Sequence, residues 1–111
     1  MGLEAFPEIE NFQKLPRQVI VKGGSSTYDA KDGAQLRGIV INNIGQSICS
    51  LRVNAVILDE NKIPLLSTGI DPEPNSLQQG GIGSFTVQFK ELSHRIHDYH
   101  LYVDWKFDDR E

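Results

Sequence analysis

The chain has 111 residues, of which 39% are hydrophobic and 23% charged, so it is long and apolar enough to bury a core of its own. Its formal net charge of −4 comes without any block of Lys and Arg, which disfavours binding to nucleic acid. A single cysteine, Cys49, excludes an internal disulfide and a cysteine-based zinc site. No stretch is apolar over a bilayer's width, so we expect no direct membrane insertion.

The predicted elements begin after an irregular first segment. Residues 1–17 contain Pro7 and Pro16 and no clean periodicity, which predicts a linker or loosely docked arm, with a short helix over 8–14 as the alternative. From residue 18 the pattern is β. We predict strands over 18–22, 34–42, 50–59, 63–70, 82–90 and 99–107, and a brief pairing at 76–77. Residues 23–33 are rich in Gly, Ser and Asp, which is turn chemistry.

These elements predict one all-β domain over residues 18–108, followed by a solvated tail at 109–111. About seven short antiparallel strands, separated by regular turn signals, are typical of an immunoglobulin- or fibronectin-like β-sandwich. No segment shows sustained helical periodicity. Alternation along the strands predicts a core made of these residues: Leu36, Val40, Leu51, Val53, Ala55, Ile57, Phe85, Val87, Phe89, Leu101, Val103 and Trp105.

Three motifs in order along residues 34–107 are similar to those of a known family. They are Gly38-x-Val40-x-Asn42, Ala55-Val56-Ile57-Leu58-Asp59 and Phe85-x-Val87-x-Phe89. This arrangement resembles the FxLYD-type domains, which are prokaryotic immunoglobulin-like modules often found at the cell envelope. Asp59 fits the last position of the namesake motif, while Ala55 and Leu58 replace its Phe and Tyr. In outline the chain is also similar to the water-stress, late-embryogenesis-abundant sandwich domains. Both resemblances imply a non-enzymatic module.

The sharpest cluster of chemistry-bearing residues is the histidine group His94, His97 and His100, with Asp98 and Asp104 nearby. Imidazole is a common ligand of transition metals, and Asp can complete a shell. On a strand, an odd spacing would send side chains to opposite faces, so only a turn could bring His94 and His97 together. The alternative interpretation is a solvated loop that enters the last strand. We expect no metal and no cofactor, with His94 and His97 kept as the candidate metal ligands.

The sequence offers no convincing catalytic set. Cys49 lies on the way into a strand, with no helix N-terminus to activate its thiol. No spacing suggests a paired acid and base, and serine hydrolase signatures are absent. We therefore predict that the chain is not an enzyme.

Surplus apolar residues on the outward strand faces are the most useful functional signal. The alternation turns five candidate partner-binding residues outward: Val56, Leu58, Tyr102, Ile39 and Ile41. Val56, Leu58 and Tyr102 would form one patch if the strands over 50–59 and 99–107 share a sheet. Two alternatives remain. The N-terminal arm could cover this surface with its own apolar residues, or the predicted facing could be one residue out of register. The apolar residues of the arm are Phe6, Ile9, Phe12 and Leu15.

The leading hypothesis is a binding or accessory module that recognises a protein partner, or a second copy of itself, through a sheet face or an edge strand. A structural or stress-protective domain without a fixed ligand is the first alternative. A metal-handling domain using His94 and His97 is the second. A disulfide-free sandwich folds in the cytosol and outside it, so the compartment stays open, and only the family resemblance suggests the cell envelope.

Overall fold

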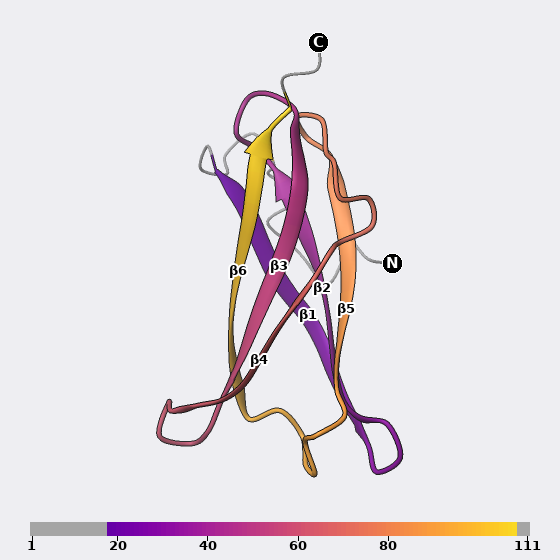
Figure 1. Cartoon of the computed structure of the whole chain (residues 1–111), viewed down its shortest axis with the longest axis vertical. Coiled ribbons are helices and arrows are strands. Elements are labelled where there is room, and N and C mark those ends of the chain that lie inside the picture. Colours follow the sequence, from indigo (N-terminus) through magenta and orange to yellow (C-terminus); the bar gives the residue numbers. More distant parts are fainter. Residues whose placement is uncertain (1–17, 109–111) are drawn as a thin grey trace.

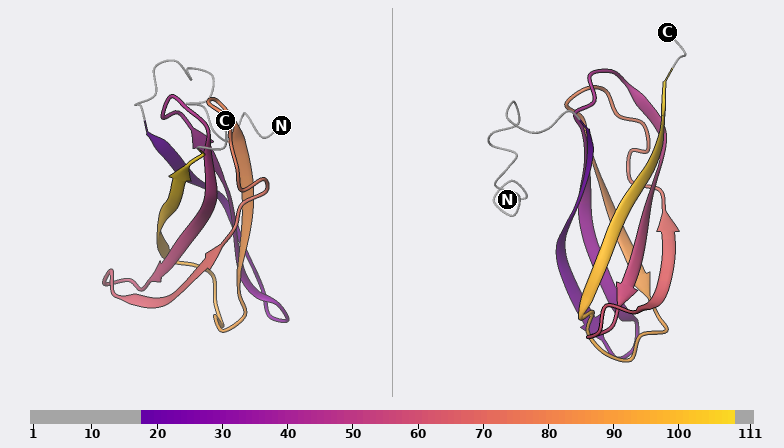
Figure 2. Two further views of the ribbon diagram at one scale, coloured as in Figure 1. Left: turned by 45° about the horizontal axis from the view of Figure 1, so that its top comes forward. Right: turned by 90° about the vertical axis from the view of Figure 1, so that its left-hand side faces the viewer.

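The computed structural model describes residues 18–108, and the predicted arm at 1–17 and tail at 109–111 lie outside the described residues. The described chain forms six strands and two antiparallel sheets of three strands each, in the orders β1-β2-β5 and β4-β3-β6. The sheets lie face to face, so the fold is a β-sandwich, as predicted (Figures 1 and 2). The strands are β1 (Val19–Asp29), β2 (Gly33–Asn42), β3 (Ile48–Leu58), β4 (Pro64–Ile70), β5 (Ile82–Phe89) and β6 (Asp98–Phe107).

The predicted pairing at residues 76–77 is reduced to one isolated bridge, between Leu77 and Ile48. The connection from β4 to β5 carries Pro72 and Pro74, which lack the N–H groups that a regular strand would donate. Leu77 is nevertheless buried and belongs to the core. The connection therefore adds an apolar side chain without adding a seventh strand.

Strand β1 is longer than the sequence predicts, and residues 23–29 are strand instead of turn. A register shift between Gly23 and Ser25 inserts a β-bulge, after which Ser25 to Asp29 continue to pair with β2. At Gly23 an added Cβ would lie 2.2 Å from the hydroxyl oxygen of Tyr99, so any larger residue would force the Tyr99 ring to move. The glycine that suggested a turn instead permits close packing of β6 over β1.

The core lies between the sheets and matches the residues predicted from alternation. Leu36, Val53 and Val87 are buried, and the β6 residues Leu101, Val103 and Trp105 are partly buried against the same cluster. Phe107 alternates with Trp105 on the inward side of β6, but it lies at the end of the strand, is 43% exposed and meets Trp105 edge-on with ring centroids 4.9 Å apart. Within residues 18–108 there is no helix that could cross a bilayer.

Candidate partner-binding face and the adjoining loop end

The outer face of the β4-β3-β6 sheet brings together three of the predicted partner-binding residues. Asn54 pairs with Tyr102, Val56 with His100 and Leu58 with Asp98. Cross-strand partners share a face, and residues two apart on one strand share it as well. Val56, Leu58 and Tyr102 therefore lie on one side of the sheet. We call these three residues the apolar face.

Exposure differs across this apolar face. Tyr102 is 47% exposed, whereas Val56 and Leu58 are half-buried. His100 pairs with Val56 of β3 and lies two residues from Tyr102 on β6. The ring centroids of His100 and Tyr102 are 6.1 Å apart, and the ring planes are tilted by 34°. On the other flank, Ser67 of β4 pairs with Val56. The face thus combines two aromatic rings with short aliphatic side chains on rigid strands.

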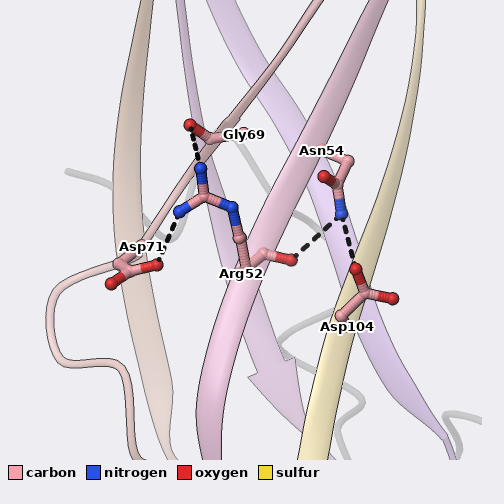
Figure 3. A network of polar contacts seen from close by, with 5 residues as sticks. All are labelled: Arg52, Asn54, Gly69, Asp71 and Asp104. Atoms are coloured by element: carbon pink, nitrogen blue, oxygen red, sulfur yellow. Dashed lines mark hydrogen bonds and ion pairs between the residues drawn. The ribbon is translucent and has the colours of Figure 1, made fainter.

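Polar side chains border the apolar face on the side of the C-terminal end of β6 (Figure 3). Arg52 donates to Asp71 at 3.2 Å and to the backbone carbonyl of Gly69 at 3.2 Å. Asn54 donates to Asp104 at 3.0 Å, which links β3 to β6. Both carboxylates have hydrogen-bonded partners although they are exposed. The apolar face therefore passes directly into an ordered polar region, the arrangement of centre and rim found in many protein interfaces.

Ile39 and Ile41 lie on the opposite side of the molecule, on the outer face of the β1-β2-β5 sheet. Ile41 pairs with Ile20 of β1 and with Ile82 of β5, and Ile39 lies two residues away on the same face. Ile41 is 0% exposed, so its side chain offers no surface to an outside partner in this structure. The five predicted residues therefore do not form one patch but divide between two sheets.

The histidines are separated in a similar way. His94 and His97 are exposed in the loop that precedes β6, whereas His100 lies on the sheet face within β6. The Nδ1 atom of His94 is 2.8 Å from the backbone oxygen of Arg95. Among residues 18–108, no three His, Cys, Asp or Glu side chains gather closely enough to hold a metal ion. The turn that could have joined His94 and His97 does not assemble a ligand set.

This loop end contains a surface cavity of about 430 Å³. Leu65 of β4 and Ile96 of the loop supply its apolar lining. Acidic and basic groups line the rest of it, so it is a mixed site with no convergent donor set. Its other lining residues are Asp59, Glu60, His94, Arg95 and His97.

The β3–β4 turn beside this cavity is organised by Asp59. Its Oδ1 atom accepts hydrogen bonds from the backbone N–H groups of Asn61 at 2.7 Å and Ile63 at 3.0 Å. Lys62 has a positive φ of 66° and donates its own N–H to the Asp59 carbonyl at 3.0 Å. In this turn a short carboxylate thus takes the place of a backbone acceptor.

The turn is tied to β6 by an ion pair between Lys62 and Asp98. The Lys62 ammonium, followed by the backbone N–H of Tyr99, holds the pKa of Asp98 below its usual value. Both effects favour the charged carboxylate. The sequence had associated Asp98 with metal binding, but in the structure its carboxylate forms an ion pair with Lys62.

Sequence reasoning missed Leu65, which is 46% exposed, and Ile63, which is 55% exposed. A register shift between Ile57 and Leu58 breaks the alternation at the start of β4, so a period of two does not assign Leu65 correctly. The one available signal was Pro64, which is typical of an edge strand. In the described chain, β4 pairs with β3 and is an edge of its sheet.

Two further features lie elsewhere in the described chain. A second cavity of about 610 Å³ lies at the other end of the sandwich, and Gln46, Gln78, Gln79 and Asp108 supply much of its polar lining. Cys49 is half-buried, and its sulfur lies 3.9 Å from the carbonyl oxygen of Phe107. Among residues 18–108, neither place brings an acid, a base and a nucleophile together.

Comparisons of the chain with protein-family models, with curated proteins and with solved structures gave no match. The assignment of a function therefore rests on the residues of this chain and on their arrangement.

Proposed function

We propose that this chain is a non-enzymatic binding module, and that it recognises a protein partner through the apolar face of the β4-β3-β6 sheet. The observation that carries the proposal is the convergence of Val56, Leu58 and Tyr102 on one surface next to an ordered polar border. Tyrosine is enriched at interfaces because its ring buries a large area at a low entropy cost. The resemblance to FxLYD-type, immunoglobulin-like domains supports the same class of function.

The partner segment that fits best is an extended one that lies along β4. This strand is the most exposed in the fold, and Ile63 and Leu65 flank its start with apolar side chains. An edge strand has main-chain N–H and C=O groups that a further strand can pair with. Side chains of the added segment would then alternate, so that every second one points to the same side of the sheet as Val56 and Leu58.

Photocrosslinking in cells tests this proposal. A photoreactive phenylalanine analogue is placed at Tyr102, and the same analogue at Thr86 is the control, because Thr86 is an exposed residue on the outer face of the other sheet. We expect the Tyr102 probe to yield one defined protein adduct that the Thr86 probe does not yield. Adding Val56→Asp to the Tyr102 probe should remove that adduct.

Two results would count against the proposal. Equal adducts from the Tyr102 and Thr86 positions would mean that the face has no selectivity. An adduct that survives Val56→Asp would mean that the apolar face does not supply the contact. An adduct whose mass is twice that of this chain would identify the partner as a second copy.

A further inference from the structure

The outer face of the β1-β2-β5 sheet is buried at one end, although no sheet packs on it in the described chain. Val40, Ile41 and Asn42 are consecutive residues of β2, and each is 0% exposed. Side chains alternate along a strand, so three consecutive buried residues require cover on both faces. The other sheet covers the inner face. A second cover is therefore needed on the outer face.

This cover is local. The buried outer row runs across the sheet through Ile20, Ile41 and Ile82, which are 8%, 0% and 40% exposed. Further along the same face, Arg37 and Thr86 are exposed. Burial is therefore deepest over β1 and β2, at the end where the chain enters β1.

We propose that residues 1–17 of this chain provide the outer cover, docking their apolar side chains on Ile20, Ile41 and the half-buried Ile39. This inference does not depend on the proposed function, because it concerns the opposite sheet. Residues 1–17 directly precede the buried row, since β1 begins at Val19. They carry five large apolar side chains at intervals of three residues: Leu3, Phe6, Ile9, Phe12 and Leu15.

Reach and chemistry both favour this occupant. Neighbouring strands lie about 4.8 Å apart, so crossing from β1 to β5 takes roughly 10 Å, which a few extended residues can span. The exposed part of the row, Ile82, lies farthest from Val19 and so receives the least cover. A segment whose apolar residues are separated by polar and charged ones can bury one side and keep the other in water.

The test uses the full chain labelled with ¹³C at its isoleucine methyl groups. We expect nuclear Overhauser contacts from the Ile41 methyl to Phe12, Leu15 or another apolar residue of the segment. A variant with Phe6, Ile9, Phe12 and Leu15 all changed to Ser should lose these contacts, expose the Ile41 methyl to a soluble paramagnetic agent, and lower Tm by about 5–10 °C. A triple control, Glu4→Ser, Glu8→Ser and Glu10→Ser, should leave the contacts and Tm unchanged.

Two outcomes would overturn the inference. Contacts from Ile41 that reach only strand residues would mean that the segment does not cover it. In a mixture of labelled and unlabelled chains, contacts between molecules would assign the cover to a second copy. Because the contacts are measured on the unmodified chain, the test stands even if the fourfold variant does not fold.

Discussion

The two ends of the sandwich are held together differently. Where β2 ends, the buried side-chain amide of Asn42 links the neighbouring loops, whereas where β3 turns into β4, exposed charged side chains form the link. Asn42 is 0% exposed, donates from Nδ2 to the carbonyls of Gln46 and Leu77, and accepts from the N–H of Ile44. Its backbone also pairs with Gly80 and Gly81. Three chain segments thus meet at one residue.

The opposite end, at the bottom of Figure 1, contains the β3–β4 turn and the loop at 91–97. There an ion pair joins Lys62, whose side chain is 74% exposed, to Asp98. A buried hydrogen bond that loses one partner leaves a desolvated group behind, while an exposed pair that is broken returns both groups to water. We therefore expect the two ends to differ sharply in their response to mutation.

The largest effect is expected at Asn42. Asn42→Ala leaves the carbonyls of Gln46 and Leu77 and the Ile44 N–H without their partner, which should lower the free energy of unfolding by about 3 kcal/mol. Chemical denaturation measures this change. Gln46→Ala is the matched control, because it keeps the Gln46 carbonyl and removes only an exposed side chain. Equal losses in the two variants would refute the contrast between the ends.

A smaller effect is expected at Asp59. Asp59→Ala removes the acceptor of two backbone N–H groups in the β3–β4 turn, with an expected loss of about 1–2 kcal/mol. Asp59→Asn keeps an oxygen at the same place and should recover most of the stability. Urea unfolding of both variants, with Glu60→Ala as the neighbouring control, measures the difference. If Asn and Ala behaved alike, the oxygen would not be what holds the turn.

The ion pair should be visible mainly through pH. The folded pKa of Asp98 lies below its unfolded value, so the pair stabilises the fold above about pH 4, and this stabilisation is lost as pH falls through the folded pKa. Lys62→Met should raise the pKa of Asp98 and flatten this part of the stability profile. A carboxyl NMR titration of the two proteins compares the pKa values directly. An unchanged Asp98 titration in the variant would show that Lys62 is not the cause.

The smallest effect is expected at the histidines. His94→Ala with His97→Ala should leave Tm unchanged, because both side chains are exposed. Thermal unfolding after chelator treatment, with and without added zinc, nickel or copper, also examines metal binding. A rise of several degrees that disappears in the double variant would establish a metal site at the loop end.

Sequence reasoning recovers the interior of this fold better than its margins. The five strands from β2 to β6 were predicted within two residues at each end, and for β2, β3, β5 and β6 the reason is their regular alternation. The second half of β1 was missed because Gly23, Gly24 and the serines that follow have turn-like composition. Their strand conformation depends on a bulge and on pairing with β2, which composition does not reveal.

The candidate site, too, was predictable only where strand alternation determines it. Alternation assigns Val56, Leu58 and Tyr102 to outward positions, and the register then places them on one face. Alternation also turns Ile41 outward, but it does not say what covers that side chain. The pairing of Lys62 with Asp98 joins the β3–β4 turn to the start of β6, and a single sequence carries no pattern that links positions 36 residues apart.

The pairing of β2 with β5 has a kinetic consequence. Ala34 pairs with Phe89 and Leu36 with Val87, so the central strand of one sheet waits for a partner that lies beyond the whole β3–β4 hairpin. The chain must therefore close a long loop before the β2–β5 contacts can form. Folds with such long-range pairing typically fold in milliseconds to seconds. While β5 is still being synthesised, β2 has β1 alone as a partner within its sheet.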